Sequence, residues 1–334
     1  MSTEQKKHSP SGACLPDRQG AGGGRSLPSG EGQGGALSNW LTAFRLRTLP
    51  LSLSTIFMGS FLACFYGHFR LDVLVWASLT TLFLQILSNL ANDYGDYVSG
   101  ADGEHRKGPD RMMQSGRITA GAMKKAITIF AVLSFLSGVT LLYITFHGRV
   151  SLLFVLFVLL GIGAIAAAMK YTMGKNPYGY RGLGDLFVFI FFGLVGVAGT
   201  YFLHALELNT FVWFPAVSVG LLSAGVLNVN NIRDEESDRV SGKKTLVVMM
   251  GGRKARVYHV FLVTVAVLLL VVLTILQYRS SWQFLFLLTL PLFVKHVLVV
   301  VKNYDLAKLD TELKRLALLT FFTVLLFGVG MLLS

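Results

Sequence analysis

Long apolar stretches, separated by short polar segments, make up most of the chain after residue 46. A helix needs about 20 apolar residues to cross the hydrocarbon core of a bilayer. Apolar and polar residues do not alternate over ten-residue segments, as they would in a membrane β-barrel. We therefore predict an all-α polytopic membrane protein with nine transmembrane helices. Their predicted ranges are 47–67, 71–92, 122–147, 150–170, 184–206, 210–231, 256–277, 281–301 and 315–334.

Composition supports this fold class. Of the 334 residues, 53% are hydrophobic and only 14% are charged, whereas soluble domains carry about 25% charged residues. The net charge of +12 requires no nucleic-acid partner, because basic residues at the membrane surface set topology and attract anionic lipid headgroups. We expect contact with membrane lipid and no nucleic-acid binding. Cys14 and Cys64 suggest neither a disulfide framework nor a CxxC metal site.

The distribution of Lys and Arg predicts the orientation. If the N-terminus is cytoplasmic, the four connections on that side carry 18 Lys and Arg residues, in segments 93–121, 170–183, 232–256 and 302–315. The connections on the other side carry only Arg70, Arg149 and Arg279. Because cytoplasmic loops are enriched in Lys and Arg, we expect a cytoplasmic N-terminus and a C-terminus on the opposite face.

The first 37 residues differ from the rest. They are rich in Gly and Ser and show no apolar period, which predicts a disordered tail. They also lack the apolar core of a signal peptide. The remaining residues, 38–334, form one predicted membrane domain.

Two polar segments follow apolar stretches on the predicted cytoplasmic side. They are NLANDYGDYVSGAD (89–102) and NVNNIRDEESDRVSGKKT (228–245). In the second, Asn230, Asp234 and Asp238 are spaced four residues apart, so a helix would place them on one face.

The first segment has a similar arrangement. Asn92 and Asp96 are also four residues apart, and Asp93 lies beside them. Asp102 follows Gly100, where we expect the helix to end, so Asp102 would fold back over the mouth of the site. The two segments correspond at a separation of 138 residues, which indicates two related halves.

This pattern is suited to a metal ion and a diphosphate. Carboxylates near hydrocarbon need cations, and clustered carboxylate and amide oxygens suit Mg²⁺. Basic residues follow each acidic segment and could bind anionic oxygens. These are Arg111 and Arg117 after the first, and Arg233, Lys243 and Lys244 in or after the second. At a membrane, the expected substrate is an isoprenyl diphosphate, whose allylic C–O bond ionises when charge on the leaving group is stabilised.

The motifs NDxxDxxxxxD at Asn92–Asp102 and NxxxDxxxD at Asn230–Asp238 resemble those of the UbiA superfamily of intramembrane prenyltransferases. Three passages are most similar to the 1,4-dihydroxy-2-naphthoate polyprenyltransferases of menaquinone synthesis. They are NLANDYGDYVSGAD with GPDRMMQSGRIT, YGYRGLGDLFVFIFFGLVGVAGTYF, and NVNNIRDEESDRVSGKKTLVV. The resemblance covers about residues 38–334.

The resemblance implies a UbiA-type bundle with a site that opens on the cytoplasmic face and holds two Mg²⁺ ions. The implied metal ligands are Asn92, Asp96, Asp102, Asn230, Asp234 and Asp238. It also implies diphosphate contacts from Arg111, Arg233 and Lys244, with Lys243 as a further candidate and Arg117 close by in sequence.

For the acceptor, the resemblance implies that Tyr180–Asp185 borders the aromatic ring. Asp185 would orient or deprotonate a phenolic hydroxyl, although a role as helix N-cap is equally consistent with its position. Asp93 is a second candidate base.

The implied reaction joins a polyprenyl chain to 1,4-dihydroxy-2-naphthoate, releases CO₂ and diphosphate, and gives demethylmenaquinol in a bacterial plasma (inner) membrane. Alternatives are another aromatic acceptor (4-hydroxybenzoate, homogentisate or haem) and a membrane cation transporter. A transporter is disfavoured because its acids usually lie near the bilayer midplane in broken helices. The DGxxAR motif of CDP-alcohol phosphotransferases does not occur.

Overall fold

The computed structural model describes residues 33–100, 111–303 and 305–334, and these residues form helices and connections without a strand. Nine helical segments among them are long and apolar enough to cross a membrane. The predicted all-α fold class is therefore confirmed. In chain order, the elements are α1 (Gln33–Phe44), η1 (Leu46–Thr48), α2 (Leu49–Phe65), α3 (Leu71–Val98), α4 (Ala120–Thr145), α5 (Leu152–Lys170), η2 (Tyr178–Arg181), α6 (Gly184–Val188), η3 (Phe189–Gly199), α7 (Thr200–Ala205), η4 (Thr210–Val212), α8 (Trp213–Val240), α9 (Leu246–Met250), α10 (Gly252–Leu276), η5 (Ser281–Thr289), α11 (Leu290–Lys302) and α12 (Leu306–Leu332).

Three helices extend well beyond their predicted limits. The helix α3 continues to Val98 and α8 to Val240, so both acidic motifs lie on helices that continue past the apolar stretch. The last helix begins at Leu306, although its apolar stretch was predicted to start at 315. Hydropathy marks the segment that lies in hydrocarbon, whereas a helix continues for as long as its backbone hydrogen bonds do.

The helix α1 also begins before the predicted start of the membrane domain. It starts at Gln33 and continues through η1 into α2, so Gly35–Phe65 forms one helical segment with the first span. Trp40 and Phe44 on α1 pack with Phe130 on α4. The residues from 33 to 37, predicted as part of the tail, are therefore helical.

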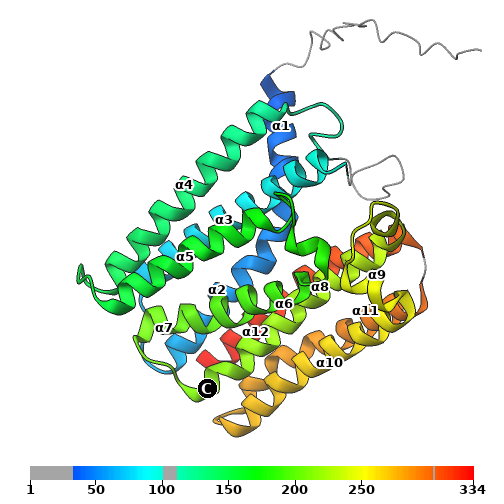
Figure 1. Ribbon diagram of the computed structural model, residues 1–334. Helices are drawn as coiled ribbons and strands as arrows, with labels where there is room; N and C mark the ends of the chain where they lie inside the picture. Colours follow the sequence, from blue (N-terminus) through cyan, green and yellow to red (C-terminus); the bar gives the residue numbers. More distant parts are fainter. Residues whose placement is uncertain (1–32, 101–110, 304) are drawn as a thin grey trace, which may run out of the picture.

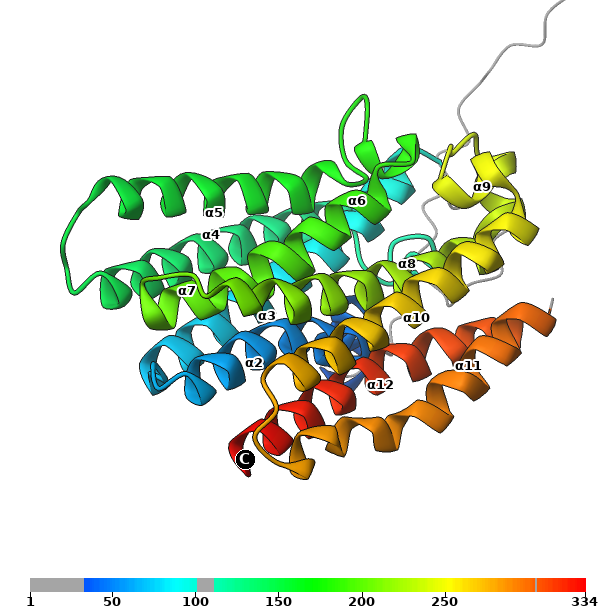
Figure 2. The same ribbon diagram turned by 90° about the horizontal axis from the view of Figure 1, so that it is seen from below.

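The helices pack as a bundle in which α2, α8 and α12 lie centrally. The views in Figures 1 and 2 place α3, α4 and α5 on one side and α10 and α11 on the other. The helix α8 packs against η3, α10 and α12, while α2 packs against α3, η3 and α12. The C-terminus lies at the end of the bundle opposite to α9 (Figure 1).

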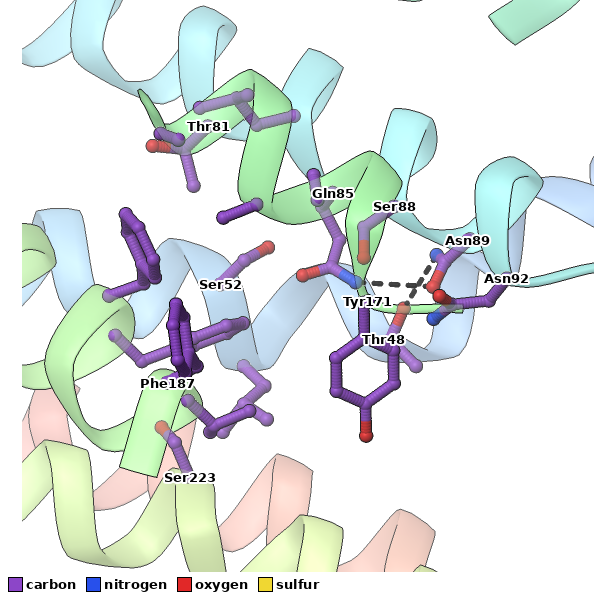
Figure 3. Close-up of a pocket in the computed structure, with 18 of the residues that line it drawn as sticks. Thr48, Ser52, Thr81, Gln85, Ser88, Asn89, Asn92, Tyr171, Phe187 and Ser223 are labelled. Carbon is purple, nitrogen blue, oxygen red and sulfur yellow. Dashed lines mark hydrogen bonds between the residues drawn. The ribbon is translucent and has the colours of Figure 1, made fainter. Parts of the chain in front are cut away.

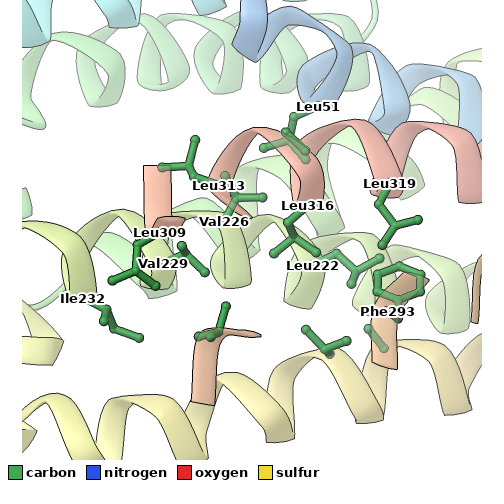
Figure 4. Packing of buried hydrophobic residues seen from close by; sticks show 14 of the residues in the cluster. Leu51, Leu222, Val226, Val229, Ile232, Phe293, Leu309, Leu313, Leu316 and Leu319 are labelled. Atoms are coloured by element: carbon green, nitrogen blue, oxygen red, sulfur yellow. The ribbon is translucent and has the colours of Figure 1, made fainter. Parts of the chain in front are cut away.

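Buried aliphatic side chains join the C-terminal helices. Figure 4 shows Leu222 of α8 beside Leu316 of α12 and Val229 of α8 beside Leu309 of α12, with Phe293 of α11 close to Leu222. Helices in a bilayer gain little from the hydrophobic effect on association, so close van der Waals contact holds them together. This half of the bundle provides a rigid support for α8 and its acidic motif.

Glycine allows two central helices to approach closely. The fifth span contains the π-helical segment η3, and a Cβ built at Gly193 in this segment would lie 2.5 Å from the Ala216 carbonyl oxygen. A Cβ at Gly220 on α8 would lie 3.1 Å from the Gly193 Cα. Residues larger than glycine at these positions would separate η3 from α8.

Candidate active site

A cavity of about 690 Å³ opens between α2, α3, α5, α6, η3 and α8. Both predicted motifs line one end of it, through Asn92, Asp93, Asp96, Asn230, Asp234 and Asp238. Figure 3 shows part of this space, with Phe187 on one side and polar side chains of α3 on the other. In this polar wall, Gln85 donates to Asn89 (3.2 Å) and Asn89 donates to Thr48 (3.1 Å).

Asp96 is the centre of the first motif. It is only 2% exposed, forms an ion pair with Arg111, accepts from the Tyr180 hydroxyl, and lies 3.1 Å from Lys243 Nζ. Burial, followed by the charge of Asp96, raises the pKa of the Tyr180 phenol far above its usual range, so Tyr180 remains a donor. Asp96 thus connects three segments of the chain.

Lys243 connects the two motifs. Its Nζ lies 3.1 Å from Asp96 and 3.7 Å from Asp238, and 4.8 Å from the centre of the Tyr180 ring. The turn after α8 positions it, because the Lys243 N–H donates to the Asp238 carbonyl (2.9 Å) and Gly242 adopts a φ of +75°. This is a Schellman motif, in which glycine tolerates the left-handed conformation.

Arg233 neutralises the second motif. Its Nε donates to Asp234 Oδ1 (2.8 Å), and its Nη2 donates to Asp234 Oδ2 (2.7 Å) and to Asn230 Oδ1 (2.9 Å). Its Nη1 donates to Asp310 on α12 (2.7 Å). The guanidinium is therefore shared between the motif and a residue outside it.

The connection after α5 orients Asn92. Thr172 Oγ1 donates to the Ala91 carbonyl (3.1 Å) and to Asn92 Oδ1 (3.2 Å), and Arg111 Nη1 donates to the Asn92 carbonyl (2.8 Å). This close approach requires Gly95, where an added Cβ would lie 2.5 Å from Thr172 Oγ1. The amide side chain is thereby held at the cavity wall.

Comparison with known families identifies the family of the chain. The model of the UbiA prenyltransferase family matches residues 52–331. The chain belongs to the UbiA prenyltransferase family. This confirms the family predicted from the two motifs.

Curated relatives of this UbiA family member cover most of its length. It is 44% identical over 295 residues to the 1,4-dihydroxy-2-naphthoate octaprenyltransferase of Escherichia coli, covering 88% of this chain and 95% of the relative. It is 42% identical over 300 residues to the protein of the same name in Haemophilus influenzae, covering 89% and 97%. The predicted similarity to this branch of the family is therefore also confirmed.

Solved structures share the fold at low sequence identity. An apo UbiA homolog from Aeropyrum pernix has a TM-score of 0.63 at 18% identity, covering 86% of this chain and 98% of that one. A UbiA homolog from Archaeoglobus fulgidus, bound to GPP and Mg²⁺, has a TM-score of 0.60 at 15% identity, covering 89% and 100%. These similarities support the UbiA-type bundle.

Not every residue predicted for the UbiA site lies at the cavity. Lys244 and Arg117 are exposed and are not among the cavity-lining residues; the Lys244 backbone N–H donates to the Tyr180 carbonyl (2.9 Å). Of the adjacent lysines, the turn after α8 directs Lys243, the further candidate from sequence, into the cavity and leaves Lys244 outside it. Asp102 lies outside the described residues.

Asp185 is buried in the first turn of α6 but does not line the cavity. Tyr258 on α10 lies near its carboxylate. The N-cap of α6 is Leu183, whose side chain makes no capping bond, so the alternative interpretation of Asp185 as the N-cap is wrong.

Sequence reasoning overlooked several cavity residues. Arg45 and Arg47, which flank the start of η1, both line the cavity. Arg45 adopts the left-handed conformation (φ 50°), which is uncommon for a residue other than glycine. The only signal in the sequence was two arginines just before an apolar stretch, which also fits a topological role.

The adjacent lysines provide a direct test of the geometry. We expect Lys243→Gln to lower prenyl transfer by roughly 100-fold, because it removes a cation, 12% exposed, beside two acids. We expect Lys244→Gln to lower it by less than about threefold. Initial rates of both purified variants would be compared at saturating substrate. An equal loss in the two variants would contradict the placement of Lys243.

Proposed function

We propose that the protein transfers a polyprenyl chain from polyprenyl diphosphate to 1,4-dihydroxy-2-naphthoate, with loss of CO₂ and diphosphate, to give demethylmenaquinol. The observation that carries this proposal is the meeting of both acidic motifs at one polar end of a largely apolar cavity. Relatives named as octaprenyltransferases for this acceptor support it. Neighbouring folds solved with GPP or DMAPP and Mg²⁺ support the donor class.

The oxygen donors at the polar end fit Mg²⁺. Within the described parts of the chain, no three His, Cys, Asp or Glu side chains converge enough to hold a metal alone. Mg²⁺ takes one or two protein carboxylates and completes its shell with water and substrate phosphate, so this sparse arrangement is appropriate. Two ions would be held by Asn92 and Asp96 on α3 and by Asn230, Asp234 and Asp238 on α8, with Asp102 as a further predicted ligand.

Bound magnesium would neutralise charge that develops on the departing diphosphate. The protein supplies further cations at the same place, since Arg111 and Lys243 both contact Asp96. These donors are fixed before substrate arrives, which is the arrangement that stabilises a developing anion most effectively. Cleavage of the allylic C–O bond would leave a prenyl cation in the apolar part of the cavity.

The apolar part of the cavity is suited to the prenyl chain and its cation. Aromatic and aliphatic side chains from α3, α4, α5 and the fifth span line it, namely Leu84, Phe135, Phe157, Leu160, Phe187 and Phe191. Such walls exclude water from the cation, and aromatic faces stabilise positive charge. A ring carbon of the acceptor would then bond to C1 of the prenyl group.

The acceptor requires a base for its hydroxyl and a cation for its carboxylate. Asp93 is 3% exposed and lines the cavity, so of the two candidate bases it is the one that can reach the acceptor. Arg45 and Arg47 line the same cavity and would bind the carboxylate. When that group leaves as CO₂ from the carbon that is prenylated, its electron pair restores the aromatic ring.

The distribution of basic residues supports a site on the cytoplasmic face, and the bacterial relatives support the inner membrane of a bacterium. The connections that carry most of the Lys and Arg lie at the same end of the bundle as both acidic motifs. By the positive-inside rule, this end faces the cytoplasm and the C-terminus faces the opposite side. Water-soluble acceptor and released diphosphate would then exchange with the cytoplasm.

A product assay with competing acceptors tests the function. Purified protein in detergent would receive geranylgeranyl diphosphate, 1,4-dihydroxy-2-naphthoate and 4-hydroxybenzoate, with Mg²⁺ or EDTA. We expect a prenylated naphthoquinone that lacks the carboxyl group, formed only with Mg²⁺ and identified by mass spectrometry. Prenylated hydroxybenzoate would overturn the assigned acceptor, and absence of any product from folded protein would overturn the assigned activity.

A further inference from the structure

Arg233 is buried and binds two acids at once. Its side chain is 3% exposed, and it donates from two nitrogens to both oxygens of Asp234 and from the third to Asp310 at 2.7 Å. Asp310 lies in the first turns of α12, far in sequence from both motifs. The second oxygen of Asp310, Oδ2, lies 2.7 Å from Lys314 Nζ and 3.9 Å from Arg47 Nη1.

This geometry places Arg233 in competition with a metal ion. Both carboxylate oxygens of Asp234 lie within 2.8 Å of guanidinium nitrogens. Each oxygen keeps a lone pair for a metal ion, but the positive charge of Arg233 opposes the binding of Mg²⁺ beside it. Asp234 would therefore bind the metal more strongly after Arg233 turned away from it. A buried guanidinium that loses its acidic partner is strongly unfavourable, so the exchange needs a second acid within reach.

We propose that Asp310 is a positioning residue. It keeps Arg233 in an ion pair when Asp234 releases Arg233 and binds the metal. This inference rests on the proposed function and extends it to a residue outside both motifs. Because Asp310 already binds Nη1, Arg233 can release Asp234 by rotating about that contact, with no unpaired intermediate. Lys314 and Arg47 contact the other oxygen of Asp310, Oδ2, and leave Oδ1 to Arg233.

The first test is metal binding measured without turnover. Mn²⁺ would replace Mg²⁺, inorganic diphosphate would be added, and free Mn²⁺ would be followed by electron paramagnetic resonance. In Asp310→Asn the amide keeps the shape of the side chain but loses its charge. Among the described residues, Asp234 is then the only acid that pairs with Arg233, so Arg233 remains bound to it. We expect the Mn²⁺ concentration at half-saturation to rise at least tenfold, and Asp310→Glu to restore most of the affinity.

Lys314→Gln is the matched control, because it removes the half-exposed partner of Asp310 and leaves the contact with Arg233 intact. We expect its half-saturation to stay within twofold of the parent protein. The Mg²⁺ dependence of product formation should shift in the same way, with the loss in Asp310→Asn larger at low Mg²⁺ than at saturating Mg²⁺. A purely structural role would instead lower the rate equally at every Mg²⁺ concentration.

Unchanged Mn²⁺ affinity in folded Asp310→Asn would overturn the role of Asp310. An equal rise in Lys314→Gln would also overturn it. Loss of a positive charge cannot by itself weaken Mn²⁺ binding, so that result would reflect a general disturbance of this part of α12. Failure of the proposed function is distinguishable, because it appears as a missing product in the parent protein. The Mn²⁺ measurement does not depend on any product.

Discussion

Replacement of Asp96 by Asn is expected to lower prenyl transfer by roughly 1,000-fold or more. The amide has nearly the same shape but no charge, and Asp96 is the buried acid that Arg111, Lys243 and the Tyr180 hydroxyl all contact. Without it, two cations face each other at the polar end of the cavity, and one proposed metal ligand is lost. Initial rates at saturating Mg²⁺ and substrate would measure the effect.

The control is Asp72→Asn on the same helix. Asp72 lies in the first turn of α3, pairs with Arg70 at 2.8 Å, is 45% exposed, does not line the cavity, and lies at the end of the helix opposite to the acidic motif. Exposed ion pairs contribute about 1 kcal/mol or less, so this variant should stay within about threefold of the parent rate. Activity of Asp96→Asn within tenfold of the parent, in protein that elutes as a folded species, would contradict the assigned site.

Replacement of Gly193 by Leu is expected to have the largest effect on stability. The new side chain would begin 2.5 Å from the Ala216 carbonyl oxygen and 2.8 Å from the Gly220 Cα. Because these are backbone atoms of α8, relief requires η3 to move away from α8. Overpacking of this kind costs about 3 kcal/mol or more, and thermal unfolding in detergent should show a clear drop in Tm.

Gly163→Leu provides the comparison. Gly163 lies on α5, and a Cβ built there has no neighbour within 4 Å. Leucine at this position would face lipid and favour the helix by about 0.5 to 1 kcal/mol, so Tm should stay the same or rise slightly. A similar drop in Tm for both variants would show that general helix effects, and not the contact between η3 and α8, determine stability.

Much of the site follows from the sequence because the motif residues lie on continuous helices. Asn230, Asp234 and Asp238 share a face of α8 by their spacing alone, and the structure places all three at the cavity. The helix end near Gly100 was also predicted correctly, since α3 ends at Val98 and Gly100 has a φ of +69°. Local geometry fixed these features, and no tertiary information was needed.

The residue that pairs with each acid could not be predicted from helical spacing. Lys243 and Lys244 are neighbours of the same type, and only the turn after α8 directs the first toward Asp96. Asp185 was predicted at the acceptor, yet the packing of α6 turns it toward Tyr258 on α10. Asp310 was not predicted at all, because its contact with Arg233 spans 77 residues.

The sequence by itself determined the membrane helices, because a chain in hydrocarbon must satisfy its backbone hydrogen bonds within each segment. It also determined the two acidic faces, since helical periodicity relates residues three or four positions apart. The tertiary structure alone decided which cations neutralise those faces and which residues line the cavity. Those contacts join different helices, and their geometry depends on close packing at positions such as Gly95, Gly193 and Gly220.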